Sequence, residues 1–209
     1  MNIAAYAIAF LALYYLSKRT SNGYSTILPI IYTGQQKAGR ISRTLVYAQL
    51  IATYGVMYGV DPAAIASLIA VESEGIPCKF AKAGGAEYIG LMQIAHKTAQ
   101  WQGYGGAPYA TSGYDCPPMT GLFNPETNIQ FGAKYLAYQF GRYKSLEFAI
   151  SAYQSGQLKT DSSGKVLNLG YVKTVLDFVP SFREFYRSKM ANYNTQFPGT
   201  TWDPAVLLV

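Results

Sequence analysis

The sequence predicts a mainly helical protein built around one principal domain. Apolar residues recur at helical spacing over most of the chain, whereas runs with the two-residue alternation of a strand are scarce. Two cap-then-proline signatures, Asp61-Pro62 and Asn124-Pro125, mark helix starts. A chain of 209 residues, half of them hydrophobic, is long enough to bury one sizeable core. We therefore expect residues 42–188 to form a single helical domain.

The chain begins with an uncharged apolar run at residues 3–16, which ends at Ser17, Lys18 and Arg19. As a helix this run would be about 21 Å long, shorter than the ~30 Å hydrocarbon core of a bilayer, although Lys18 could snorkel. Its start lacks the positive charge, and its end lacks the small residues, of a cleaved signal peptide. We expect an uncleaved membrane-anchor helix at residues 1–19, with a buried core helix as the alternative.

The next segment, residues 20–41, mixes glycine, serine and proline with short apolar pieces, and we expect it to be a linker. Basic residues gather after the apolar run: Lys18, Arg19, Lys37, Arg40 and Arg43. This asymmetry favours a cytoplasmic position for everything that follows the anchor.

The first half of the domain is expected to hold two well-marked helices. One covers residues 43–58 and is followed by Gly59, a common helix stop. The other begins at the first cap-then-proline signature and runs to Glu72. Residues 76–123 are rich in glycine, proline and tyrosine, which suits loops that wall a cleft, with a short helix near residues 90–100.

The second half is expected to hold three more helices. The second cap-then-proline signature starts a long helix at residues 124–143. Another covers residues 145–155 and is stopped by a glycine, and a last one covers residues 168–188, where Pro180 should kink or divide it. Residues 189–209 form an aromatic tail with no clear period.

One carboxylate falls on the buried face of its predicted helix. The residues at positions i, i+3, i+4 and i+7 of that face are Ile65, Leu68, Ile69 and Glu72. Burial disfavours the ionised form of a carboxyl group and so raises its pKa, which is what a general acid needs at neutral pH. The alternative is that Glu72 ends the helix and turns into water. Glu74, two residues on, points elsewhere and is expected to be solvated.

Charge and cysteine content restrict the function classes. The net charge of +6 suits an anionic partner, either nucleic acid, lipid headgroups or a cell wall, but no nucleic-acid recognition motif is visible, so we expect no nucleic-acid partner. Two cysteines and one histidine are too few for a zinc site, and no glycine motif suits a phosphate, so we expect neither metal nor cofactor. Cys78 and Cys116 could form a disulfide in an oxidising compartment, or both could stay buried thiols.

Short motifs follow one another along the domain. They are Glu72-Ser73, Gly90-Leu91-Met92-Gln93-Ile94, Asn124-Pro125-Glu126-Thr127-Asn128-Ile129, Ala152-Tyr153-Gln154-Ser155-Gly156 and Tyr171-Val172. In this order, and with compatible spacing, they resemble the signature of lytic transglycosylases of the soluble-lytic-transglycosylase (SLT) type. The resemblance runs from about Ser42 to Arg187. The step from Glu72 to Gln93 is slightly longer than the family's, which indicates a small insertion around residues 78–88.

The resemblance implies a lysozyme-like fold and an enzyme that cleaves the β-1,4 bond between N-acetylmuramic acid and N-acetylglucosamine in peptidoglycan (murein). By position, Glu72 would be the sole catalytic acid and base, and the product would be a 1,6-anhydromuramyl sugar. The residues that the resemblance places in supporting or substrate-binding roles are Ser73, Met92, Gln93, Asn128, Tyr153, Gln154 and Tyr171.

Within this set, Tyr153 would lie against Glu72 and Tyr171 would face a saccharide. The family usually has Asn where this chain has Gln154, so a hydrogen bond of that motif would be rebuilt or lost. Four of them also have structural alternatives: Ser73 as a helix-end residue, Met92 as core, and Tyr153 and Tyr171 as filling between helices.

Two other functions remain open from the sequence. One is a hydrolysing lysozyme on the same fold, in which water replaces the sugar hydroxyl, and the other is a non-catalytic wall-binding assembly protein. We expect a membrane-anchored protein, held through residues 3–16, whose domain acts in the periplasm or cell wall. Because the basic residues favour the opposite side of the membrane, we also consider a phage virion or a secretion apparatus that carries its own wall-opening enzyme.

Overall fold

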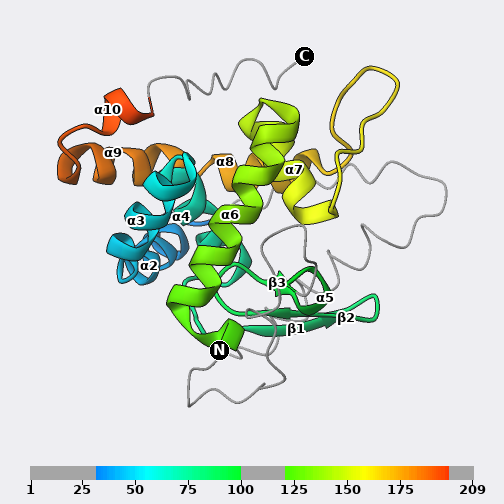
Figure 1. The fold of residues 1–209 in the computed structure, drawn as a ribbon, viewed down its shortest axis with the longest axis horizontal. Helices are drawn as coiled ribbons and strands as arrows, with labels where there is room; N and C mark the ends of the chain where they lie inside the picture. The colour runs from blue at the N-terminus through cyan, green and yellow to red at the C-terminus, as the bar shows by residue number, and fades with distance from the viewer. Residues whose placement is uncertain (1–31, 100–120, 198–209) are drawn as a thin grey trace.

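The computed structural model describes residues 32–99 and 121–197. The elements of these residues are, in order, α2 (Gly34–Leu45), α3 (Ala48–Tyr58), α4 (Pro62–Glu72), β1 (Phe80–Ala83), β2 (Ala86–Ile89), β3 (Ile94–Ala95), α5 (His96–Ala99), the 3-10 helix η3 (Gly121–Phe123), α6 (Pro125–Tyr143), α7 (Leu146–Ser155), α8 (Leu169–Leu176), α9 (Val179–Lys189) and α10 (Tyr193–Gln196). Helices dominate, and a small sheet lies at one side of them (Figure 1), so the prediction of a mainly helical domain is confirmed.

Helix α4 is the centre of the helical part. Every residue from Pro62 to Val71 is buried, and α4 packs against α2, α3, α6, α8 and α9. A helix that is apolar on all sides suits such a position, and its alanines let the neighbouring helices approach closely. The Asp61 side chain caps the start by accepting a hydrogen bond from the Ala63 backbone N–H at 2.8 Å, as its cap-then-proline signature predicts. Glu72 is the last residue of this buried helix.

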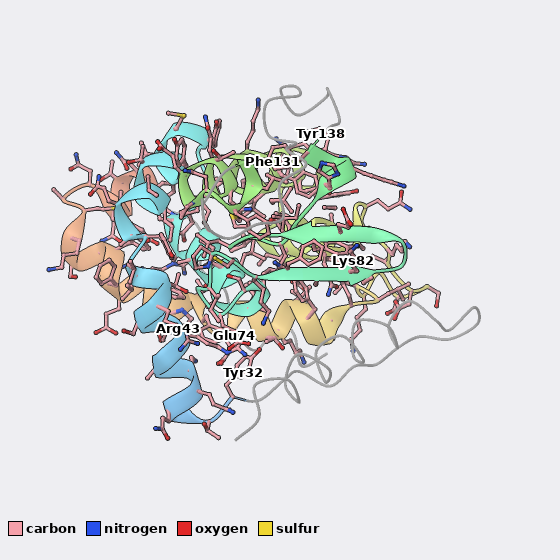
Figure 2. All side chains as sticks on the ribbon, turned by 90° about the horizontal axis from the view of Figure 1, so that it is seen from below. Tyr32, Arg43, Glu74, Lys82, Phe131 and Tyr138 are labelled. Carbon is pink, nitrogen blue, oxygen red and sulfur yellow. The ribbon has the colours of Figure 1, made fainter. Side chains whose placement is uncertain are left out.

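The N-terminal helices differ from the expectation. The segment expected as a linker, residues 20–41, contains most of α2, and the helix expected at residues 43–58 is divided into α2 and α3. A capping box starts α2: the Thr33 side chain accepts from the Gln36 N–H, and the Gln36 side chain accepts from the Thr33 N–H. Figure 2 shows Arg43 of α2 beside Glu74 in the turn that follows α4.

A three-stranded antiparallel sheet occupies residues 80–95, where loops and a short helix were expected. Strand order is β1-β2-β3, with Phe80 opposite Ile89 and Ile89 opposite Ile94. Gly84 and Gly85 join β1 to β2, and both have positive φ, as a two-residue type I′ hairpin turn requires. The helix expected near residues 90–100 is reduced in the described residues to the short α5.

The helices in the second half of the domain follow the prediction. Asn124 caps α6 and Ser145 caps α7, and α7 ends at Gly156, whose backbone is left-handed. The last long helix is divided into α8 and α9, and Pro180 lies in the first turn of α9, where its missing N–H costs no hydrogen bond. Local start and stop signals therefore define this half.

The C-terminal elements are attached to the start of α4. The carboxylate of Asp61 pairs with Arg183 of α9, with 2.9 Å between Oδ2 and Nη2, and also accepts a hydrogen bond from the Tyr193 hydroxyl of α10. Tyr193 is 2% exposed. Residues 189–209 were expected to be an aperiodic tail, but their first part is this docked helix.

Several expectations concern residues outside the described part of the chain: the anchor helix at residues 1–19, most of the linker before residue 32, and the end of the tail. Across residues 32–99 and 121–197, no helix combines the length and apolar character needed to cross a bilayer.

Candidate active site

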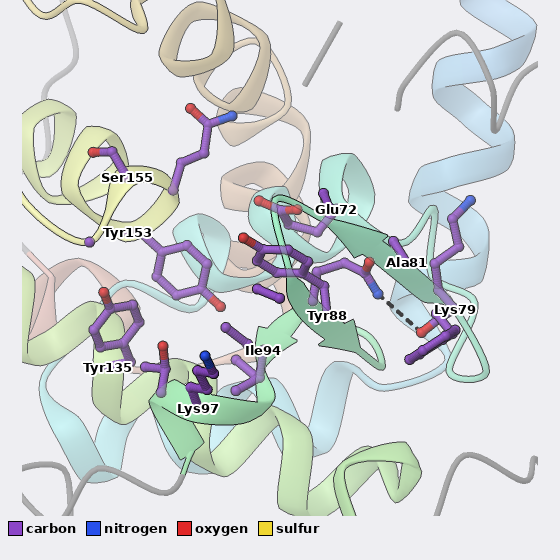
Figure 3. Close-up of a pocket in the computed structure, with 17 residues that line it drawn as sticks. Glu72, Lys79, Ala81, Tyr88, Ile94, Lys97, Tyr135, Tyr153 and Ser155 are labelled. Atoms are coloured by element: carbon purple, nitrogen blue, oxygen red, sulfur yellow. Dashed lines mark hydrogen bonds between the residues drawn. The ribbon is translucent and has the colours of Figure 1, made fainter. Parts of the chain in front are cut away.

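A cleft of about 340 Å³ opens where α4 ends. One part of its wall comes from Glu72 and the sheet, and the other comes from α6 and the end of α7 (Figure 3). The polar and aromatic residues that line it include Glu72, Lys79, Tyr88, Gln93, Lys97, Tyr135, Tyr153 and Gln154. The wall is mainly apolar and aromatic with a few polar groups, which is typical of a ligand site.

The carboxyl group of Glu72 is half-buried at the cleft and is held by a tyrosine. The hydroxyl of Tyr171, from α8, donates a hydrogen bond of 2.5 Å to Oε1 of Glu72. Burial raises the pKa of Glu72 to about 7, and the hydrogen bond from Tyr171 opposes this by stabilising the carboxylate. Near neutral pH the group can therefore both give and accept a proton.

Tyr153 of α7 lines the cleft, and its hydroxyl is bound to the backbone of Met92. Its hydroxyl donates to the Met92 backbone carbonyl at 2.9 Å, whereas the tyrosine in hydrogen-bond contact with Glu72 is Tyr171. Burial raises the pKa of Tyr153 well above its ordinary value, and the negative charges of Glu72 and of ionised Tyr135 would add to this rise. Tyr153 thus stays a neutral hydroxyl that fixes the chain at Met92.

Gln93 lines the cleft with a constrained side chain. Its Nε2 donates to the Lys79 carbonyl at 3.1 Å and to the Gly90 carbonyl at 2.9 Å. Its backbone has φ +46°, a left-handed conformation uncommon outside glycine. Such backbone geometry persists only where the surroundings hold it, and it is concentrated at functional sites.

Asn128 supports the cleft from behind. It is fully buried, its Oδ1 accepts from the Met92 N–H at 2.7 Å, and its Nδ2 donates to the carbonyls of Ile89 and Leu122, both at 2.8 Å. A side chain on Gly90 would collide with this amide, because its Cβ would lie 2.3 Å from Nδ2. Asn128 therefore fixes the backbone of the cleft wall and, like the buried Met92, does not line the cleft.

Ser73 has the contact of a helix-end residue. It is buried, and its hydroxyl donates to the Ile69 carbonyl at 3.1 Å, one turn back in α4. This contact fits the alternative role of Ser73 as a helix-end residue, and it places the hydroxyl at the end of α4 instead of in the cleft.

Gln154 reaches the cleft and is anchored at the same time. Its Oε1 accepts from Asn168 Nδ2 at 2.8 Å, and Asn168 exchanges two further hydrogen bonds with Ser151 of α7, at 2.6 and 3.0 Å. Asn168 directly precedes α8, which carries Tyr171. Gln154 therefore links the end of α7 to the residue that precedes α8.

Some cleft residues were not identified from the sequence, among them Lys79, Tyr88, Lys97 and Tyr135. The general signals were present, since the chain holds 19 tyrosines and residues 76–123 suit a cleft wall. Tyr88 reaches the cleft from β2 and Tyr135 from α6, and how these elements pack around the cleft is not encoded in a local pattern.

One of the two cysteines lies within the described residues. Cys78 is not a free thiol in the structure, but Cys116 lies outside the described residues, so their disulfide stays a prediction. Within the described ranges, no group of three or more His, Cys, Asp or Glu side chains is arranged to hold a metal ion.

Comparison with known proteins gives consistent results. A family model described as "Transglycosylase SLT domain" matches residues 49–166. The chain is also similar to two curated proteins named "Endo-type membrane-bound lytic murein transglycosylase A", one from Klebsiella pneumoniae subsp. pneumoniae and one from Klebsiella pneumoniae strain 342. Each is 35% identical over 98 residues, which cover 46% of this chain and 44% of the relative. The chain thus spans less than half the length of these relatives.

Proposed function

Because this chain belongs to the transglycosylase SLT family, we propose that it is a lytic transglycosylase that cleaves the glycan strands of bacterial peptidoglycan. The observation that carries the proposal is the state of Glu72: a half-buried carboxyl group with a pKa raised to about 7, at the edge of a cleft. A group with this pKa holds a proton in a large share of molecules at neutral pH, as a general acid must.

In the proposed first step, protonated Glu72 donates its proton to the glycosidic oxygen between N-acetylmuramic acid and N-acetylglucosamine. The bond from that oxygen to muramyl C1 breaks, the N-acetylglucosamine leaves with a free hydroxyl, and Glu72 becomes a carboxylate. Positive charge develops at C1 in this step. The hydrogen bond from Tyr171 then stabilises the new carboxylate, since it favours the charged form.

In the proposed second step, the Glu72 carboxylate removes the proton from the muramyl C6 hydroxyl, whose oxygen bonds to C1. This closes the 1,6-anhydro ring and returns the proton to Glu72, so no water is consumed. A retaining glycosidase instead needs a second carboxylate about 5 Å away as nucleophile. Among the described residues that line the cleft, Glu72 is the only acidic one, which supports a one-carboxylate reaction.

The test is digestion of purified murein by the wild-type protein and by Glu72→Gln, with the products separated and weighed by mass spectrometry. We expect the substitution to lower the rate by about 10²- to 10⁴-fold, the usual contribution of a general acid. The matched control is Glu184→Gln, which removes an exposed carboxylate of α9 and should leave the rate unchanged. Full activity of Glu72→Gln would contradict the catalytic assignment.

The product mass separates the proposed reaction from that of a lysozyme. An anhydromuramyl end is lighter by one water molecule than the reducing end that hydrolysis leaves. A digest containing reducing ends alone would show that water is the acceptor, and would overturn the second step while leaving Glu72 as the acid.

For the location, we propose a membrane-attached enzyme that acts on the cell wall from the periplasm. The names of the two relatives describe them as membrane-bound, and residues 3–16 of this chain supply the apolar run for an anchor. A phage virion or a secretion apparatus, with its own route of insertion, is the alternative raised by the basic residues after that run.

A further inference from the structure

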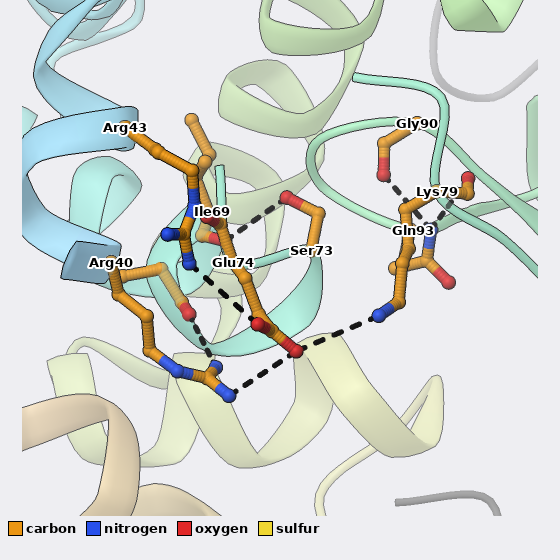
Figure 4. Close-up of polar contacts among 9 residues, drawn as sticks. Arg40, Arg43, Ile69, Ser73, Glu74, Lys79, Gly90 and Gln93 are labelled. Carbon is orange, nitrogen blue, oxygen red and sulfur yellow. Dashed lines mark hydrogen bonds and ion pairs between the residues drawn. The ribbon is translucent and has the colours of Figure 1, made fainter. Parts of the chain in front are cut away.

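Glu74 lies two residues after Glu72 but does not line the cleft, and its side chain lies among Arg40, Arg43 and Lys79 (Figure 4). It was expected to be solvated, but its side chain is 29% exposed and pairs with cations from two other segments. Its carboxylate oxygens lie 3.3 Å from Arg40 Nη2, 3.6 Å from Arg43 Nη2 and 3.6 Å from Lys79 Nζ. We call these four residues the Glu74 cluster.

The first side of the Glu74 cluster fixes the turn that follows α4. Arg43 Nε donates to the Glu74 backbone carbonyl at 2.7 Å, and Glu74 itself has φ +62°, a left-handed backbone. Gly75 comes so close to α2 that a Cβ there would lie 2.8 Å from the backbone of Arg43 and Thr44. Helix α2 therefore lies directly against the turn at the end of the helix that carries Glu72.

Arg40 makes this attachment firm. Its side chain is 11% exposed, its Nη1 donates to the Ala70 carbonyl of α4 at 2.8 Å, and its guanidinium lies 4.2 Å from the centre of the Tyr32 ring. Isolated surface ion pairs contribute little to stability, but a cation this buried needs a counter-charge, and Glu74 supplies it.

The second side of the Glu74 cluster reaches the segment just before the sheet. Lys79 directly precedes β1, and its backbone carbonyl accepts from the Gly90 N–H at 2.8 Å and from Gln93 Nε2 at 3.1 Å. One carboxylate thus connects the end of α4 with the backbone that orients Gln93. Both Glu72 and Gln93 line the cleft.

We propose that Glu74 is a positioning residue, whose three cations hold Glu72 and Gln93 at a fixed separation in the cleft wall. The inference rests on the proposed function, because the separation matters for a proton donor that must meet a sugar bound in the cleft. A displacement of about 1 Å in such a site can cost about 100-fold in rate.

The test compares Glu74→Gln with a matched control, Asp177→Asn. Glu74→Gln keeps the size of the side chain and the Arg43 bond to the backbone carbonyl but removes the charge. Asp177→Asn likewise removes the charge from the other ion pair of α2, Lys37 Nζ to Asp177 Oδ2 at 2.9 Å, and keeps the Lys37 bond to the Asp177 carbonyl at 2.7 Å. Neither Lys37 nor Asp177 lines the cleft.

The measurements are kcat and KM on soluble peptidoglycan glycan strands, at the pH optimum of each variant, together with thermal unfolding. For Glu74→Gln we expect kcat to fall about tenfold while KM stays within about twofold, because position and not affinity is lost. For Asp177→Asn we expect both to stay within about twofold of wild type.

Three results would overturn the inference: an unchanged kcat in Glu74→Gln, an equal loss of kcat in Asp177→Asn, or a loss confined to KM. If Glu74→Gln fails to fold, Lys79→Gln replaces it, since it cuts only the connection to β1 and leaves the pairs with α2. An unchanged kcat in Lys79→Gln then contradicts the proposal.

A wild-type protein that releases no product from murein contradicts the proposed function itself, whereas an active wild type with an unaffected Glu74→Gln contradicts the inference alone.

Discussion

At Glu72, burial and a hydrogen bond act on the pKa in opposite directions. Loss of solvent raises it to about 7, and the donor from Tyr171 limits the rise. A deeper pocket without that donor would favour the neutral acid and oppose the return of the proton to a carboxylate. The tyrosine therefore balances the two proton transfers that we propose for the same side chain.

The burial that prepares Glu72 also costs stability above neutral pH. Its pKa rises from 4.5 in the unfolded chain to about 7 in the folded protein, so between these pH values the folded state binds more protons. Stability then falls as pH rises through this window, by at most about 3 kcal/mol at about 1.4 kcal/mol per pKa unit. Glu72→Gln should thus exceed wild type in free energy of unfolding at pH 8 and match it at pH 4.

Denaturant unfolding at the two pH values checks this prediction. Glu184→Gln, which changes an exposed carboxylate, serves as the reference and should show no such dependence. A difference between wild type and Glu72→Gln that is the same at both pH values would show that ionisation of Glu72 is not its cause.

Sequence reasoning could identify Glu72 but not what surrounds it. The apolar spacing of α4 places this residue on a buried face, and that information is local. Its contact with Tyr171 joins residues 99 positions apart, which no local pattern encodes. For Glu74, the helical geometry correctly indicated a direction away from Glu72, but it could not reveal the cations that the side chain meets there.

Among the elements, those with chemical start signals were predictable. Asp61 and Asn124 each cap a helix as their cap-then-proline signatures predict, and Pro180 lies in the first turn of α9, the second part of the divided last helix. Helix α2 was missed because it buries few side chains, so apolar spacing is weak, although its capping box at Thr33 was a readable signal. The sheet was missed because its strands are too short for alternation to be visible.

The packing of the sheet on α6 depends on Asn128, which leads to a prediction at this scale. Asn128→Ala would leave the Met92 N–H and the carbonyls of Ile89 and Leu122 without their partner in the protein interior. We expect a loss of about 2–5 kcal/mol in free energy of unfolding, since each buried unsatisfied group costs about 1–3 kcal/mol.

Urea unfolding measures this loss, and Gln130→Ala is the control. Gln130 is two residues along α6 and makes one longer side-chain hydrogen bond, 3.4 Å to the Tyr58 hydroxyl, so its removal should cost under about 1 kcal/mol. Equal losses in the two variants would mean that Asn128 contributes only as any residue of α6 does.

At the scale of the whole molecule, the two ends of α4 are held by different parts of the chain. Its C-terminal turn is attached to α2, and its start is attached to α9 and α10 through Asp61. Arg183→Met would leave the Asp61 carboxylate, whose side chain is 2% exposed, without this cation. We expect a loss of about 3–5 kcal/mol in free energy of unfolding, the usual cost of breaking a buried pair from one side.

The control is Arg187→Met on the same helix. Arg187 is exposed and donates a surface hydrogen bond from Nε to Asn194 Oδ1 at 3.0 Å, so we expect a change within about 0.5 kcal/mol. Thermal or denaturant unfolding compares the two variants. If Arg183→Met is no less stable than Arg187→Met, the attachment of α9 to α4 does not depend on this ion pair.

The order of motifs along the chain, from Glu72 to Tyr171, predicted the family that the comparison with known domains shows. The fold as a whole was therefore predictable from a resemblance, whereas the arrangement of the N-terminal helices and the sheet was not, because both depend on contacts between distant segments. The anchor and the disulfide remain predictions.

Because α4 is fully buried, the part of the cleft at its end is fixed by packing, whereas the part formed by the hairpin of β1 and β2 is not. A substitution in α4 disturbs five neighbouring helices at once, so the position of Glu72 is difficult to change by gradual mutation. The hairpin of β1 and β2 lies at the edge of the fold, and most of its side chains carry little of the core. Substitutions in this hairpin therefore disturb the core least, and an engineer who wishes to reshape the cleft should begin there and leave α4 intact.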